Sequence, residues 1–236
     1  MEGVVARRVI PSDNSCLFNA VGYVMDHDKN KAPELRQVIA ATVHLGLPKF
    51  ILLDKQSGIH NYNLEVYHKL SFAFGAGLVG NLLIYCADFY LIFCGEGAIE
   101  LSILADYYGR EIAAYDIQTT RCDLYGQGKK YSERVMLIYD GLHYDALAMS
   151  PFDGAPEEFD QTIFHVRSDR TIGPIEGLAL NLVKEQHRKR SFTDTARFTL
   201  RCGVCQIGVV GQKILIVLLR EFPGRCTGHV NFQEYR

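Results

Sequence analysis

The stretch Asp13-Asn14-Ser15-Cys16-Leu17-Phe18 decides how the chain is interpreted, because it places a thiol between a turn and a helix. Turn-forming residues occupy positions 11–15, and the largely apolar positions 17–25 predict a helix. Cys16 then lies at the N-terminus of that helix, where the helix dipole favours a thiolate over a thiol. The pattern therefore predicts a reactive cysteine.

A histidine far downstream completes the pattern. Residues 134–139 predict a buried strand that ends at Asp140-Gly141, and His143 follows this turn with Asp145 two positions later. A thiol nucleophile at Cys16, a base at His143 and a carboxylate that orients the imidazole are the parts of a cysteine hydrolase. The alternative interpretation takes the cysteine as a small core residue and the histidine as an ordinary polar residue.

The cysteine loop also offers backbone N–H groups that lack a helical acceptor. We expect those of Asn14, Ser15 and Cys16 to form an oxyanion hole for a tetrahedral intermediate. No cofactor is expected for catalysis.

The two motifs resemble those of a known family. Asp-Asn-Ser-Cys-Leu-Phe at 13–18 and Leu-Ile-Tyr-Asp-Gly-Leu-His-Tyr-Asp at 137–145 are similar to the motifs of the ovarian-tumour (OTU) domain cysteine deubiquitinases. The similarity is greatest to the branch with a C-terminal zinc finger, and to its plant members in particular. It covers residues 3–44, 96–205 and 228–235.

The resemblance implies a role for each site residue. Cys16 is the implied nucleophile, His143 the base, Asp13 the acidic residue of the cysteine loop, and Asp145 the residue that orients the histidine. The implied reaction is hydrolysis of isopeptide bonds at the C-terminal glycine of ubiquitin, and the implied partners are ubiquitin and polyubiquitin chains.

Two other functions stay open at this point. One is a catalytically impaired ubiquitin-binding module, and the other is a papain-like or other Cys-His amide hydrolase. The Cys-Gly-Ser-Cys-Trp context of the papain-like enzymes is absent, and the chain has no tryptophan.

Composition bounds the fold and the partners. A chain of 236 residues that is 48% hydrophobic with a net charge of -2 can bury one sizeable core and a small appended module. A slightly negative net charge does not favour binding to a polyanion, so no nucleic-acid partner is expected. The seven cysteines are scattered and residues 1–8 hold no apolar signal core, which favours a reducing cytoplasmic or nuclear location.

Helical and strand patterns alternate along the chain, which predicts an α/β (α+β) fold with a small central sheet flanked by helices. The resemblance implies that this is the cysteine-protease-like OTU fold. We expect an OTU catalytic domain over 1–168, a helical linker over 169–197 and a degenerate zinc-finger-like segment over 198–236. Besides the helix over 17–25, helices are expected from Pro33, over 97–108 with an end at Gly109, and over 175–190. The expected strands are 111–117, 134–139 and an edge strand at 162–166.

Residues 45–94 fit this plan poorly and are interpreted as an atypical insertion or replacement, from a translated intron or a variant exon. Within them, residues 72–94 carry a single charge, Asp88, and are long enough to span a bilayer as a helix. A single span there would separate Cys16 from His143 across the membrane. We therefore expect no membrane association.

The C-terminal segment carries a metal-ligand spacing. Cys202 and Cys205 are separated by two residues, as in tetrahedral zinc sites, and His229 follows near the end. The family has two histidines after the cysteines, whereas here one of them is missing. The segment therefore predicts either a structural zinc held by these three residues, with Cys226 as the candidate fourth ligand at a position that is not the family's, or two thiols in a hairpin without metal.

Overall fold

A six-stranded sheet forms the centre of the larger folded part of the chain. The computed structural model describes residues 3–13, 15–44, 97–194, 199–202, 208–210 and 232–234. The sheet has the strand order β1-β5-β4-β2-β3, and β6 pairs with β4 beyond this path. Only β2 and β4 run parallel among these pairs; the others are antiparallel. The strands are β1 (Val4–Arg8), β2 (Glu111–Asp116), β3 (Cys122–Tyr125), β4 (Glu133–Tyr139), β5 (Tyr144–Ser150) and β6 (Phe164–His165).

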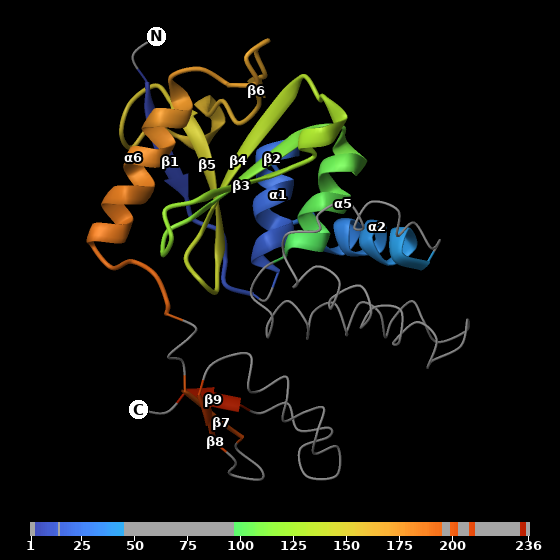
Figure 1. Ribbon diagram of the computed structural model, residues 1–236, viewed down its shortest axis with the longest axis vertical. Coiled ribbons are helices and arrows are strands. Elements are labelled where there is room, and N and C mark those ends of the chain that lie inside the picture. The colour runs from blue at the N-terminus through green and yellow to red at the C-terminus, as the bar shows by residue number, and fades with distance from the viewer. Residues whose placement is uncertain are drawn as a thin grey trace.

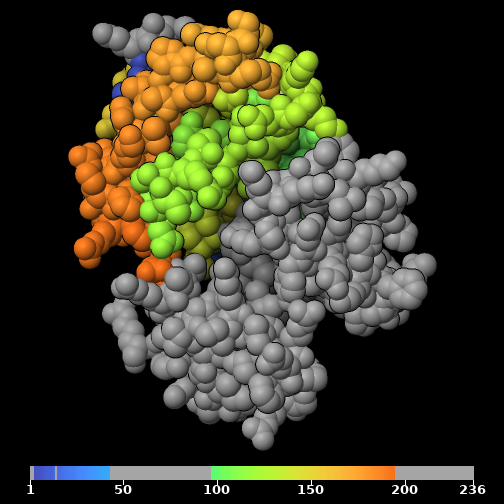
Figure 2. Space-filling model, viewed as in Figure 1, coloured from blue at the N-terminus to red at the C-terminus, as the bar shows by residue number. Residues whose placement is uncertain are grey.

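Helices cover both faces of this sheet, with α6 on one side and α1, α2 and α5 on the other (Figure 1). The space-filling view shows α6, in orange, against the residues of the sheet (Figure 2). The four helices are α1 (Cys16–Asp26), α2 (Ala32–His44), α5 (Ala98–Tyr108) and α6 (Ile175–Arg188). One-turn 3-10 helices lie at Gln127–Lys129 and Glu157–Phe159.

Alternation along the central strands explains the two cores. Ile112 and Ala114 of β2 pack toward α1, α2 and α5, whereas Ala113 and Tyr115 pack toward α6. All four are buried, as are the middle residues of β4. A sheet covered on both faces requires such continuous apolar strands, and this is why the sequence reveals β2 and β4 clearly.

The predicted fold is confirmed, and the predicted elements that are described lie close to their expected places. Pro33 lies in the first turn of α2, and α5 ends at Gly109, whose φ of 63° is the left-handed conformation that glycine adopts readily. The 162–166 strand is reduced to the two residues of β6. Strands β1, β3 and β5 were not predicted, because β1 and β3 are only 5 and 4 residues long and β5 contains alanine and aspartate, residue types that favour strands weakly.

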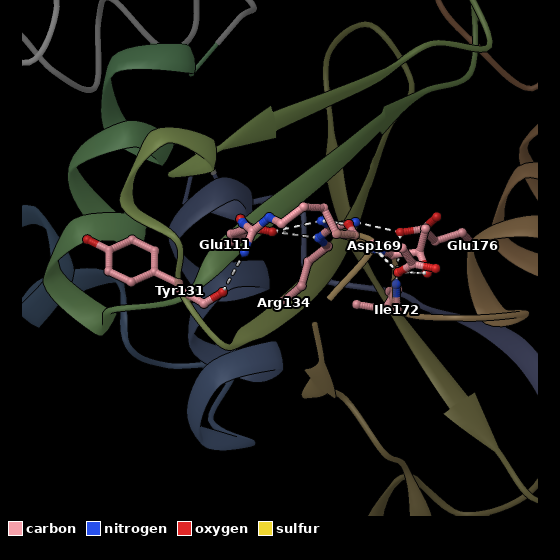
Figure 3. A network of polar contacts seen from close by, with 8 residues as sticks. Glu111, Tyr131, Arg134, Asp169, Ile172 and Glu176 are labelled. Atoms are coloured by element: carbon pink, nitrogen blue, oxygen red, sulfur yellow. Dashed lines mark hydrogen bonds and ion pairs between the residues drawn. The ribbon is translucent and has the colours of Figure 1, made fainter. Parts of the chain in front are cut away.

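A buried ion network joins β2, β4 and α6 at one end of the sheet (Figure 3). Glu111 is fully buried, and its carboxylate accepts hydrogen bonds from Nε and Nη2 of Arg134 at 2.9 and 2.8 Å. Arg170 pairs with the same carboxylate, and Arg134 also pairs with Glu176 of α6. The network fixes the helix against the first residues of the two parallel strands.

A second, three-stranded sheet has the order β8-β7-β9, with both pairs antiparallel. Its strands are β7 (Thr199–Cys202), β8 (Gly208–Val210) and β9 (Phe232–Glu234). None of the helices within the described ranges has the length and apolar character needed to cross a bilayer. The stretch 45–94, including the apolar residues 72–94, lies outside those ranges.

Candidate active site

Cys16 is the first residue of α1, as predicted, and its side chain is half-buried. The helix follows Ser15, whose φ of -122° and ψ of 8° are not helical, and it has no acidic residue in its first turn. The positive end of the helix dipole therefore acts on the thiol without a neighbouring helix carboxylate to oppose it. The apolar positions that follow are buried and anchor this end of the helix in the core.

The turn that carries His143 is held by Asp140. One carboxylate oxygen of Asp140 accepts the backbone N–H groups of Leu142 at 3.1 Å and of His143 at 2.8 Å. Gly141 adopts a φ of 102°, and its lack of a side chain lets the chain after α6 pass close by, because a Cβ would overlap the carbonyl oxygen of Thr193. Thr193 also donates its backbone N–H to the Asp140 carbonyl at 2.7 Å. The histidine turn is thus fixed from two directions.

The imidazole of His143 joins the thiol to a carboxylate. Its Nε2 lies 3.0 Å from Oδ1 of Asp145, and Cys16 at the start of α1 contributes to the raised pKa of the same ring. Because an ionised carboxylate only accepts, Nε2 carries the proton, which leaves Nδ1 for the thiol. Ser12 Oγ lies 3.4 Å from Nδ1. Hydrogen bonding to Asp145 and then to Cys16 raises the pKa of His143 to about 10, so the imidazolium is favoured at neutral pH.

Asp145 is buried at the start of β5, with a side chain only 2% exposed. Burial opposes its ionisation, but hydrogen bonds from His143, from the backbone N–H of Ile10 and from Arg7 outweigh burial and lower its pKa. The distances are 2.7 Å from Ile10 N to Oδ1 and 2.7 Å from Arg7 Nε to Oδ2. The carboxylate is therefore charged and held in one orientation, as a residue that orients the histidine needs to be.

Asp13 lies within the cysteine loop, and its carboxylate shapes that loop. It accepts the backbone N–H of Ser15 at 3.0 Å and the side-chain amide of Asn19 at 3.4 Å. This arrangement places Asp13 as a support for the turn before Cys16, where short polar side chains commonly bond the backbone two residues on. Asn14 lies outside the described residues, and with it a part of the predicted oxyanion hole.

Several residues of the site were not predicted from the sequence. Arg36, buried on α2, donates from Nη2 to Ser15 Oγ at 3.1 Å, and its guanidinium carbon lies 4.5 Å from the centre of the Phe18 ring. Burial lowers the pKa of Arg36, while the charges of Asp13 and Cys16 act in the opposite direction. A cation thus stands beside the cysteine loop. Arg7, Ile10 and Ser12 were missed as well, and all three precede the motif that drew attention.

Comparison with known proteins identifies the family. Over 236 residues the chain is 64% identical to "OVARIAN TUMOR DOMAIN-containing deubiquitinating enzyme 2" of Arabidopsis thaliana, and the alignment covers all of both chains. The chain belongs to the OTU-domain deubiquitinating enzymes. It is also 40% identical over 235 residues to "Ubiquitin thioesterase OTU1" of Gallus gallus, which covers 98% of this chain and 66% of that protein. The predicted family and the predicted class, a cysteine-type hydrolase, are confirmed.

Two further likenesses agree with this assignment. The family model "Ubiquitin thioesterase OTU1, C-terminal C2H2-type zinc finger" matches residues 196–235, which confirms the zinc-finger branch. A solved structure, "Structure of Ovarian Tumor (OTU) domain in complex with Ubiquitin", resembles the chain with a TM-score of 0.55 at 21% identity, and covers 81% of this chain and 92% of that one. This likeness shows the OTU fold.

The predicted metal ligands lie at the margin of the described structure. Cys202 is described by its backbone, which pairs with Phe232 in the small sheet, while Cys205 and His229 lie outside the described residues. The Cys202–Phe232 register pairs a strand near the beginning of the zinc-finger match with a strand near its end. Within the described ranges, no group of three or more His, Cys, Asp or Glu residues is placed to hold a metal.

Proposed function

We propose that the chain hydrolyses isopeptide bonds at the C-terminal glycine of ubiquitin, in conjugates and in polyubiquitin chains, with Cys16 as nucleophile, His143 as base and Asp145 as the residue that orients the histidine. The single observation that carries this proposal is the His143 imidazole, which hydrogen-bonds Asp145 on one side and has its pKa raised by Cys16 as well as by Asp145, in a member of this family. Asp13 supports the proposal as a residue that positions the cysteine loop.

The reaction follows from these roles in two steps. The Cys16 thiolate attacks the carbonyl carbon of the glycine, and the oxyanion that forms accepts hydrogen bonds from backbone N–H groups of the cysteine loop. The His143 imidazolium gives its Nδ1 proton to the departing lysine amine, which leaves a thioester between ubiquitin and Cys16. Neutral His143 then takes a proton from water, and the resulting hydroxide attacks the thioester. The intermediate collapses and expels the Cys16 thiolate, which restores the thiolate–imidazolium pair, and the ubiquitin carboxylic acid leaves and loses its proton to solvent.

Cleavage of lysine-linked diubiquitin by the full chain tests this proposal. The parent chain is expected to release monoubiquitin, whereas Cys16→Ser and His143→Ala are expected to lose that activity while circular dichroism shows them folded. A folded parent that binds ubiquitin without cleaving it would instead identify the ubiquitin-binding module. Cleavage retained in Cys16→Ser would place the nucleophile elsewhere.

We propose in addition that the C-terminal segment binds one structural zinc ion through Cys202, Cys205, His229 and a further ligand. Two thiolates and an imidazole form a donor set that suits tetrahedral Zn²⁺, and the family match supports it. When bound, zinc would hold the segment folded. Metal analysis of the purified chain is expected to give about one zinc per chain, and Cys202→Ser is expected to lose it; a chain prepared with zinc present that contains none would refute this site.

The expected location is the cytoplasm, with the nucleus as a second compartment, in agreement with a free thiol nucleophile that requires a reducing environment. Imaging of the tagged chain in plant cells tests this expectation. Signal confined to a secretory compartment would contradict it.

A further inference from the structure

Strand β1 carries two consecutive arginines whose side chains point to opposite faces of the sheet. Each pairs with a different buried aspartate. Arg7 Nε donates to Asp145 Oδ2 at 2.7 Å, and Arg8 Nε donates to Asp160 Oδ2 at 2.7 Å. The side chains of the two aspartates are 2% and 0% exposed. The first arginine thus reaches the carboxylate beside His143, whereas the second reaches a carboxylate elsewhere in the fold.

Arg7 occupies the carboxylate oxygen that the histidine does not use. Oδ1 of Asp145 faces His143 Nε2 at 3.0 Å and Ile10 N at 2.7 Å, while Oδ2 receives the guanidinium. With both oxygens engaged, the carboxylate cannot rotate without breaking a charge-assisted hydrogen bond. The orientation of Oδ1 toward the imidazole therefore depends on Arg7 together with the backbone N–H of Ile10.

The same guanidinium also reaches the turn that carries the histidine. Arg7 Nη2 lies 3.7 Å from Asp140 Oδ2, and the other oxygen of Asp140 accepts the backbone N–H of His143 at 2.8 Å. Arg7 thus contacts both the Asp145 carboxylate, which orients the imidazole of His143, and the Asp140 carboxylate, which fixes the backbone of His143. A lysine could supply the charge but not the planar fork that reaches both.

We propose that Arg7 is a positioning residue of the active site, which acts through Asp145 and Asp140 to hold His143 in line with Cys16. This inference rests on the proposed function for its kinetic consequence. The pairing of Arg8 with Asp160, to which Tyr23 also donates at 2.6 Å, gives the fold a comparable buried ion pair without a contact to His143 in the described structure.

Removal of the Arg7 charge should impede formation of the Cys16 thiolate. A cation near the histidine–aspartate pair is lost, and the imidazolium that stabilises the thiolate is held less firmly, so both effects move thiolate formation to higher pH. The other charged groups around the pair are Asp140, in the turn between β4 and β5, and Asp13 and Arg36 beside the cysteine loop. All three are retained in the variants.

The experiment compares Arg7→Met, Arg7→Lys and the matched control Arg8→Met in the full chain. Cleavage of diubiquitin is measured per folded molecule, and alkylation of Cys16 by iodoacetamide is followed from pH 4 to 9 by mass spectrometry. Arg7→Met is expected to lower kcat by about 10-fold to 100-fold with little change in KM, and to move the rise in alkylation to higher pH. Arg7→Lys is expected to restore part of both.

Arg8→Met is expected to lose stability while it keeps the parent kcat and the parent alkylation profile. If Arg7→Met does not fold, the kcat and the alkylation profile of Arg7→Lys are compared with those of Arg8→Lys instead. The proposal is overturned if the Arg7 variants match the Arg8 variants in both measurements. Because the alkylation profile needs no ubiquitin, it tests Arg7 even where the parent chain proves to be a binding module, which separates failure of this inference from failure of the proposed function.

Discussion

Replacement of Glu111 by glutamine removes the central charge of the buried network that joins β2, β4 and α6. Glutamine keeps the shape and one acceptor oxygen, but the Arg134 guanidinium, 7% exposed, loses its buried carboxylate. Glu176, which is 31% exposed, remains as its partner, and so does the carbonyl of Arg170 at 2.8 Å. The change therefore leaves a buried cation with incomplete compensation.

The expected loss in the free energy of unfolding follows from this geometry. Removal of one partner of a buried ion pair costs about 3–5 kcal/mol, and the remaining partners of Arg134 place Glu111→Gln near the lower end, at about 3 kcal/mol. With a urea slope of about 2 kcal/mol per molar, the midpoint should fall by about 1.5 M. Because the chain has no tryptophan, unfolding is followed by far-ultraviolet circular dichroism.

The surface pair Arg121–Asp123 provides the control. Its side chains are 68% and 39% exposed, so Asp123→Asn should cost about 0–1 kcal/mol. The Glu111–Arg134 pair lies at one end of the β2–β4 ladder, and Tyr139, which precedes the histidine turn, lies at the other end. The rate of ubiquitin cleavage per folded molecule of Glu111→Gln should therefore stay at the parent value. A loss no larger than that of Asp123→Asn would refute the reasoning, and so would a slower rate at unchanged stability.

Two further predictions concern the histidine turn. Gly141→Ala should lower stability by about 1–3 kcal/mol and slow ubiquitin cleavage, because the φ of 102° and the Thr193 carbonyl both oppose a Cβ. The control Gly154→Ala, at a φ of 79° with open space around it, should lose less stability and keep the parent rate. Equal losses of stability in urea unfolding would contradict this account. Because the pKa of His143 is raised from 6.5 to about 10, its contribution to stability is complete below pH 6.5 and is lost as the pH rises to about 10. The difference in unfolding free energy between the parent and His143→Ala should therefore narrow over that interval, and a difference that widens would show that the imidazole is neutral in the fold.

Local patterns in the sequence were sufficient for the cysteine, the histidine and the aspartate. Cys16 is marked by a turn followed by an apolar helix, and His143 by a buried strand followed by a turn, so each signal lies within a few residues of the group it predicts. Asp145 was found because it is two positions from the histidine. Their family assignment came from the same short strings.

The partners of these groups could not be predicted in this way. Arg7 and Asp145 are 138 positions apart and meet only because β1 pairs with β5 in one register, in which Arg7 lies opposite Leu147. Arg36 reaches the cysteine loop from α2 by packing over Phe18. Neither strand of the β1–β5 pair shows a strong alternation of apolar residues. In β1, arginines that pair with buried aspartates replace the usual branched residues, and in β5 small alanines do so.

The most direct test of the central claim is the reaction of the chain with ubiquitin that carries a C-terminal vinyl electrophile, read as a mass shift. Among the described residues, Cys122 is a second free cysteine, and it is exposed. Desolvation raises the pKa of its thiol to about 11, so it is expected to be unreactive at neutral pH. The account predicts one adduct in the parent and in Cys122→Ser, and none in Cys16→Ser. An adduct that persists in Cys16→Ser, or a folded parent that forms none, would contradict it.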